Sequence, residues 1–150
     1  MNALYSSKIL DLAADIPPAR RLPHPQASAV KRSRLCGSEV AVDLKVADGL
    51  VSDFGMEAKA CALGQTSASI VAREIVGSTP DELRAVAAAM RAMLKEGGAA
   101  PEGRWSDLGY LEGVKDYPAR HASTLLVFDA VLDCLDQAAV AKEAALHGGG

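Results

Sequence analysis

The sequence predicts an α+β fold, with helices packed on one face of a small three-stranded antiparallel sheet. Residues 39–60 alternate between apolar and polar side chains around an Asp48-Gly49 turn, as strands do, whereas residues 67–94 and 118–145 carry apolar side chains at helical spacing. Strands followed by a run of helices are typical of this class. A chain of 150 residues has the usual size of one domain, so residues 1–150 are expected to form a single unit.

The composition argues against several classes of function. The chain has 28 alanines but only one Trp, three Tyr and two Phe, which predicts a core of small side chains and argues against an aromatic platform for nucleic-acid bases. A formal charge of −3 gives no reason to expect a nucleic-acid or anionic membrane surface. Asp11 and Asp15 interrupt the region where a secretory peptide would be apolar, and no charge-free stretch is long enough to cross a bilayer. We therefore expect a cytoplasmic protein.

The first elements are a short helix and a strand region. Residues 8–16 form an amphipathic pattern that Pro17-Pro18 ends, and residues 19–35 have no period, so an extended segment is expected there. Strands are predicted at 39–46 and 50–56, with a third short strand at 57–60. In a small antiparallel meander, the entrance of the first strand and the exit of the third lie near the same edge. Cys36 and Cys61 flank this region.

The second half of the chain is predicted to be helical. Residues 62–66 lead into a helix at 67–76, and a second helix starts at Thr79-Pro80 and ends at Gly97-Gly98. The linker at 99–116 contains the only Trp and is too long to be a bare connection. A last helix begins at Pro118 and runs toward residue 145.

Three cysteines, Cys36, Cys61 and Cys134, are an odd number, which argues against a disulfide framework. Cys36 and Cys61 are expected on loops, and Cys61 immediately precedes a helix, an arrangement that suits soft metals. The alternative for any one of them is a small buried hydrophobic residue.

Five segments, in order along nearly the whole chain, resemble the NifU/IscU/SufU family of iron–sulfur cluster assembly scaffolds, and the second cysteine motif is closest to the SufU-like branch. They are Tyr5-Ser6-x-Lys8-Ile9-x-Asp11, Leu35-Cys36-Gly37, Asp48-Gly49-Leu50-Val51-x-Asp53, Ala60-Cys61-Ala62-Leu63-Gly64-Gln65-Thr66-Ser67-Ala68-Ser69, and Tyr117-Pro118-Ala119-Arg120.

This resemblance implies the same SufE/NifU-like α+β fold. It also implies that three cysteines and one aspartate converge to hold a transient [2Fe–2S] cluster, or Zn in its place. Sulfur would come from a cysteine desulfurase, and apo iron–sulfur proteins would receive the product. Cys36 and Cys61 match the first two family cysteines, whereas Ser38 stands at the aspartate position and Ser123 at the third cysteine position.

The two serines are departures, because a serine hydroxyl is a poor ligand for soft metals. Glu39 is one substitute for the aspartate, although strand alternation turns it to the other face. His121 is a candidate replacement for the third thiolate, although it lies about 200° from Ser123 in an ideal helix. Cys134 is about three helical turns beyond Ser123 and is interpreted as a core residue.

Two hypotheses of function follow. The first is a scaffold, or a carrier of sulfur and iron, in cluster assembly. The second is a regulatory or partner-docking paralogue that keeps the fold without building clusters. An enzyme is not expected, because the chain has no Ser-His-Asp order, phosphate-binding glycine loop or paired-carboxylate motif. Two retained cysteines per chain would also suit a homo-oligomer that shares a cluster.

Overall fold

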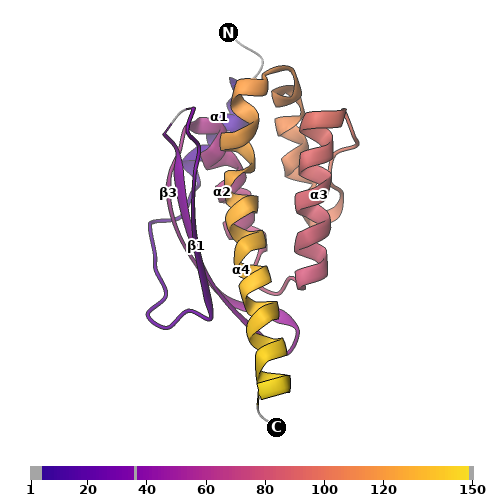
Figure 1. Ribbon diagram of the computed structural model, residues 1–150. Coiled ribbons are helices and arrows are strands. Elements are labelled where there is room, and N and C mark those ends of the chain that lie inside the picture. Colours follow the sequence, from indigo (N-terminus) through magenta and orange to yellow (C-terminus); the bar gives the residue numbers. More distant parts are fainter. Residues whose placement is uncertain (1–4, 36, 149–150) are drawn as a thin grey trace.

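A three-stranded sheet lies on one side of the molecule and helices cover it, as expected for the α+β class (Figure 1). The structure is a computed structural model that describes residues 5–35 and 37–148. In chain order, its elements are α1 (Ser7–Ala14), β1 (Ala27–Arg32), β2 (Glu39–Ala47), β3 (Leu50–Lys59), α2 (Ala62–Glu74), α3 (Pro80–Glu96), the 3₁₀ helices η2 (Gly103–Asp116) and η3 (Pro118–Arg120), and α4 (His121–Gly148).

The sheet has the strand order β1-β2-β3, and both neighbouring pairs are antiparallel. The prediction of a separate third strand at 57–60 was wrong, because β3 runs without a break to Lys59. The third strand is instead β1, within the segment predicted to be only extended. Its buried positions are Ala27 and Ala29, whose small side chains favour strands weakly and gave little sequence signal.

The Asp48-Gly49 turn sets the register of the β2–β3 hairpin. Both residues have positive φ angles, 55° and 77°, as a tight two-residue hairpin turn requires. The register pairs Glu39 with Lys59, so the start of β2 lies beside the end of β3. The two ends were expected to be close because of a three-stranded meander, whereas the two-stranded hairpin is what brings them together.

Helix α2 begins earlier than predicted, at Ala62 rather than at Ser67. The start of α2 was missed because its first turn contains a glycine and its N-cap is a cysteine, and neither residue is a strong helix signal there. Helix α3 follows the prediction closely. Thr79 caps it by accepting a hydrogen bond from the Glu82 N–H at 3.0 Å, and Gly97 ends it with a φ of 68°.

The buried core lies between the sheet and the helices. Helix α4 runs the length of the molecule, between the sheet and α3 in Figure 1. The largest fully buried side chains come from α1, β2, α2, α3 and η2 and the turn after α2, and include Ile9, Val42, Leu44, Leu63, Ile70, Ile75, Met90, Met93, Leu108 and Leu111.

On the sheet's other face, residues 17–26 form an extended strap. The Arg20 N–H donates to the Met56 carbonyl at 2.9 Å, and the Gln26 N–H donates to the Leu44 carbonyl at 3.0 Å. Gly55 allows this crossing, because a Cβ at that position would lie 2.8 Å from the Arg20 carbonyl oxygen. The strap thus connects α1 to β1 while covering β2 and β3.

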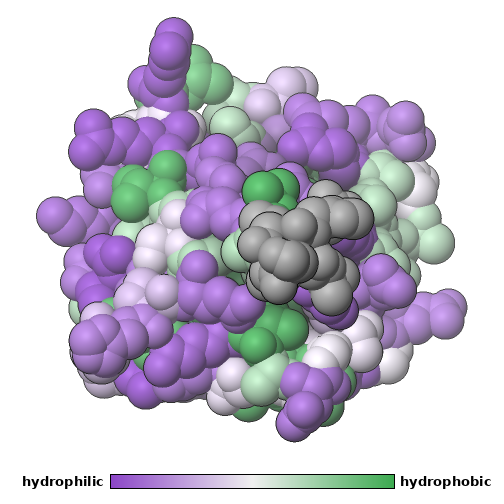
Figure 2. Space-filling model, turned by 60° about the horizontal axis from the view of Figure 1, so that its bottom comes forward, coloured by the Kyte–Doolittle hydropathy of each residue, from purple (hydrophilic) through white to green (hydrophobic). Residues whose placement is uncertain are grey.

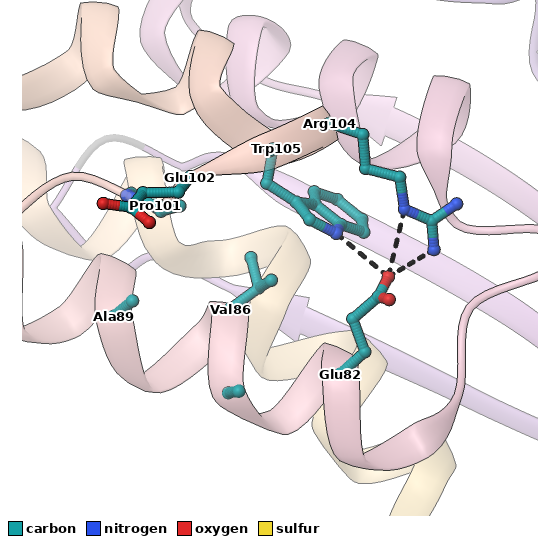
Figure 3. Close-up of a pocket in the computed structure, with 9 residues that line it drawn as sticks. Glu82, Val86, Ala89, Pro101, Glu102, Arg104 and Trp105 are labelled. Carbon is teal, nitrogen blue, oxygen red and sulfur yellow. Dashed lines mark hydrogen bonds and ion pairs between the residues drawn. The ribbon is translucent and has the colours of Figure 1, made fainter.

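The long linker folds into η2, as its length and Trp105 indicated. Trp105, Leu108, Leu111 and Val114 follow at intervals of three and are all buried, which matches the three-residue turn of a 3₁₀ helix. The Trp105 indole N–H donates to the Glu82 carboxylate at 3.1 Å, and Arg104 pairs with the same oxygen (Figure 3). These bonds fasten η2 to α3 beside a pocket of about 380 Å³.

The hairpin turn and the C-terminal part of α4 lie at one end of the molecule, which Figure 2 turns toward the viewer. The surface that is visible there is mostly hydrophilic, with separate small apolar patches. Within the part of the chain that the structure describes, no helix is long and apolar enough to span a membrane.

Candidate functional site

Cys61 stands at the N-cap of α2, immediately after β3. Its backbone is extended, with φ −67° and ψ 172°, and its carbonyl accepts the Gln65 N–H at 2.9 Å. The side chain makes no capping hydrogen bond, so the thiol is not used to start the helix. Instead, Cys61 Sγ lies 3.7 Å from Ser123 Oγ, and the S–H donates to that hydroxyl. Two residues separated by 62 positions in sequence therefore meet at this site.

Ser123 lies in the first turn of α4, and its side chain is buried. Its hydroxyl donates to the Arg120 carbonyl at 3.2 Å, and the Thr124 hydroxyl donates to the same carbonyl at 2.8 Å. The Ser123 proton is thus directed along its own chain, which leaves an oxygen lone pair for the Cys61 S–H. The start of α4 therefore holds the Ser123 hydroxyl in a fixed position.

Cys61 lines an open hollow of about 490 Å³. Gly37 and Ser38 line it from the entrance to β2, and Lys59 and Gln65 line it from β3 and α2. Cys36, the first predicted ligand, lies outside the described residues. The candidate positions that the structure brings together are thus Ser38, Cys61 and Ser123.

The turn before β2 is closed by backbone bonds. The Ser33 N–H donates to the Ser38 carbonyl at 2.9 Å, and the Gly37 N–H donates to the Ser33 carbonyl at the same distance. Gly37 has a φ of 71°, a conformation that favours glycine. This local geometry places Ser38, which is buried, at the rim of the hollow.

Similar proteins were found both by sequence and by structure, although no protein-family model matches the chain. The iron–sulfur cluster assembly scaffold protein IscU of Thermotoga maritima is 28% identical over 132 residues, which are 88% of this chain and 92% of that protein. The crystal structure of a nitrogen-fixing NifU-like protein (N-terminal) from Brucella abortus is 53% identical. It superimposes with a TM-score of 0.90 and covers 93% of this chain and 96% of that one.

The chain belongs to the NifU/IscU/SufU family of iron–sulfur cluster assembly scaffolds. Its members are scaffolds and not enzymes. A third structure, of a putative SUF-system scaffold (FiSufU) from Fervidobacterium Islandicum AW-1, is 22% identical, with a TM-score of 0.80 over 88% of this chain and 96% of that one. At this identity, the likeness supports the shared fold. The resemblance to the scaffold family and the predicted fold class are both confirmed. The likeness of the second cysteine motif to the SufU-like branch stays a prediction.

His121 was predicted as a candidate metal ligand, but its contacts are of another kind. Its Nε2 lies 3.0 Å from the Val114 carbonyl and 3.1 Å from the Lys115 carbonyl. Both partners are acceptors, so Nε2 carries the proton and donates to them. The buried ring therefore fastens the end of η2 to α4, and its hydrogen bonds go to η2 and not to Cys61.

Glu39 and Cys134 also have other partners. The Glu39 carboxylate forms an ion pair with Arg32 at 2.9 Å, across the β1–β2 pairing. Cys134 is fully buried, and its S–H donates to the Val42 carbonyl at 3.5 Å. Burial, with the nearby carboxylates of Asp133 and Asp43, raises the pKa of this thiol to about 12. Its interpretation as a core residue is confirmed.

Among the described side chains of residues 5–35 and 37–142, no three His, Cys, Asp or Glu lie close enough together to hold a metal ion. The described part of the site offers one thiol and the hydroxyls of two serines. Two further residues at the site were not predicted, Lys59 and Gly64. Gly64 was expected in the segment before the helix, so its place inside α2 gave no signal in the sequence.

Proposed function

We propose that this scaffold protein transiently holds a [2Fe–2S] cluster, or a metal ion such as Zn²⁺ or iron, through Cys36 and Cys61. The observation that carries the proposal is the Cys61 thiol, which no helix cap uses and which borders an open hollow beside Ser123. The thiolate is the form of cysteine that binds soft metals, and both metal and cluster sulfur need access from solvent or from a partner.

The surroundings of Cys61 favour a negatively charged group, such as a thiolate or a bound [2Fe–2S] cluster. The thiol lies at the N-terminus of the 13-residue helix α2, where the helix dipole favours negative charge. Lys59 adds a positive charge at the rim of the hollow. Ser38 and Ser123 are weaker ligands than the groups expected at these positions. His121 is a further candidate that would have to give up its hydrogen bonds to η2 to bind a metal. A load held mainly by two thiolates would be bound loosely, which favours transfer to another protein.

The proposed partners rest on the resemblance to the scaffold family. A scaffold without catalytic groups needs a donor of sulfur, for which a cysteine desulfurase is the proposed class, and apo iron–sulfur proteins as acceptors. We place this exchange in the cytoplasm. A homo-oligomer in which two chains share one cluster is compatible with two cysteines per chain.

The direct test is the content of iron, zinc and acid-labile sulfide per chain, in protein purified without oxygen. Cys36→Ala and Cys61→Ala are each expected to abolish the bound metal and sulfide. Cys134→Ala is the matched control, because it removes a thiol that lies in the core. Stoichiometric binding in the variant that lacks both Cys36 and Cys61 would exclude this site.

The second candidate is a docking or regulatory module that binds no cluster. It is favoured by the small number of ligands near Cys61 among the described residues. For this function, protein reconstituted with iron and sulfide would stay free of both, whereas a cysteine desulfurase would still bind. Reconstitution with about one [2Fe–2S] cluster per one or two chains would exclude it.

A further inference from the structure

Gly64 lies where helix α2 crosses the start of α4, one helical turn after Cys61. A Cβ at this position would lie 2.9 Å from the Ala60 Cβ and 3.1 Å from the backbone oxygen of Ser123. Real Cβ atoms essentially never approach another atom as closely as the first distance. A side chain at residue 64 would therefore force a shift relative to Ala60, and the Ser123 backbone of α4 would have to give by a few tenths of an ångström.

The glycine is needed for space and not for its backbone angles. Gly64 is absent from the positive-φ glycines of the described chain, and it lies inside a regular helix. A glycine in a helix costs about 1 kcal/mol relative to alanine, so helix stability alone would favour a larger residue. The close approaches to Ala60 and to the Ser123 backbone of α4 are the features that account for Gly64.

This crossing also determines the geometry of the site. The carbonyl that Gly64 approaches belongs to Ser123, and the Ser123 hydroxyl accepts the Cys61 S–H. The crossing that brings the two helices together thus also brings together the two candidate positions that they carry. Any increase in the distance between α2 and α4 at Gly64 is passed directly to the separation of Cys61 and residue 123.

We propose that Gly64 is a positioning residue that sets the distance between the Cys61 sulfur and the side chain at position 123. The effect of Gly64 on the affinity for a metal rests on the proposed function. Its effect on the distance between Cys61 and residue 123 does not. The two effects are measured separately below.

The distance is tested by disulfide formation between Cys61 and the thiol of a Ser123→Cys variant, in a Cys36→Ala background. The 3.7 Å between Cys61 Sγ and Ser123 Oγ predicts rapid cross-linking by oxidised glutathione. Cys134 does not compete, because it is buried with a pKa of about 12. Adding Gly64→Ala is expected to slow cross-linking at least about tenfold, since small displacements strongly reduce the rates of positioned groups.

Gly98→Ala is the matched control. A Cβ there would lie 3.2 Å from the Ala92 Cβ, so the substitution also crowds the end of a helix, but it lies after α3. It is expected to leave the rate of cross-linking unchanged. Equal rates for Gly64→Ala and its parent would overturn the proposal.

A second variant covers the case in which Gly64→Ala does not fold. Ala60→Gly combined with Gly64→Ala removes the contact at 2.9 Å and keeps the contact with the Ser123 carbonyl oxygen. Slow cross-linking is expected to persist in this double variant. A return to the parent rate would show that Ala60, and not α4, is the neighbour that matters, and would overturn the proposal.

The effect on metal is measured by competition for Zn²⁺ with a chelator, using the chain with all its natural cysteines. Gly64→Ala is expected to weaken Zn²⁺ binding at least about tenfold, and Gly98→Ala to leave it unchanged. An unchanged Zn²⁺ affinity in Gly64→Ala would overturn the proposal that Gly64 affects metal binding. If the parent chain bound neither zinc nor a cluster, the proposed function would fail, while the cross-linking rates would still decide the role of Gly64.

Discussion

Asp43 is a charged residue buried within the sheet. Its carboxylate accepts two hydrogen bonds from Arg21, at 2.7 and 3.0 Å, one from the Ser28 hydroxyl at 2.6 Å and one from the Leu22 N–H at 2.9 Å. Burial opposes the charge, yet these bonds outweigh it and lower the pKa of Asp43 from 3.8 to about 2. The carboxylate therefore ties the strap to β2 and β1 only while it is ionised.

The predicted consequence is a loss of stability in acid. Because the pKa is lower in the folded state, this stabilisation is complete above about pH 4 and disappears as the pH falls through about 2. It amounts to roughly 2 kcal/mol of the free energy of unfolding. Urea unfolding between pH 6 and pH 2 should show this loss in the parent and not in Asp43→Asn. Parallel curves for the two proteins would contradict the assignment.

Ser38 and Ser123 give a second prediction, on metal affinity. Ser123→Cys with Ser38→Asp should tighten Zn²⁺ binding considerably, because a thiolate and a carboxylate replace two neutral hydroxyls beside Cys61. The measurement is a competition titration with a chelator at fixed pH. Ser52→Cys, which adds an exposed thiol on β3, serves as the control. An unchanged affinity in the double variant would show that these positions do not face the metal.

Among the elements, η2 depends on a few side chains for its attachment. Trp105 is buried and donates its indole N–H to Glu82, whose pKa is lowered chiefly by the hydrogen bond from Arg104 (Figure 3). Trp105→Phe should lower the free energy of unfolding by about 1 kcal/mol through the lost hydrogen bond, and Trp105→Ala by about 3–5 kcal/mol. Circular dichroism measures both, since the only Trp is removed. A Trp105→Phe variant as stable as the parent would mean that the indole N–H contributes nothing.

The elements differ in how well the sequence predicted them. The Asp48-Gly49 turn and the Thr79-Pro80 start were predictable, because local backbone chemistry determines them. Strand β1 was not, because its buried positions are alanines and its pairing with β2 is a tertiary contact. The start of α2 was missed because the close helix crossing, and not local propensity, places a glycine there.

The same distinction applies to the site within the whole molecule. Hairpin register brings Ser38 near Cys61, whereas this closeness was expected from a separate third strand that does not form. The meeting of Cys61 with Ser123 depends on the packing of α2 against α4, which the spacing of residues does not encode. The resemblance to the scaffold family indicated position 123 as a ligand position, and the structure shows the contact of Ser123 with Cys61. His121 is the opposite case. The sequence indicated a metal ligand, but it gave no sign of the two backbone carbonyls that the buried ring binds.

At the scale of the whole molecule, the strap, the sheet and the helices form three layers, and Gly55 controls the contact between the first two. A Cβ at Gly55 would lie 2.8 Å from the Arg20 carbonyl oxygen and 3.1 Å from the Leu22 nitrogen, both of them backbone atoms. Gly55→Ala should therefore displace the strap and weaken the contacts of Arg21 with Asp43, while the helical layer stays on the other face.

The displaced strap should become a substrate for trypsin, which cleaves after arginine. Cleavage after Arg20 and Arg21 in the native state should be at least about tenfold faster in Gly55→Ala, because a strap held by fewer bonds opens more often. The helical circular dichroism signal should remain near that of the parent, and Gly98→Ala should not accelerate cleavage. Faster cleavage at every basic residue would indicate global unfolding instead. Unchanged cleavage at Arg20 and Arg21 would show that β3 absorbs the added methyl group and that the strap does not require a glycine beneath it.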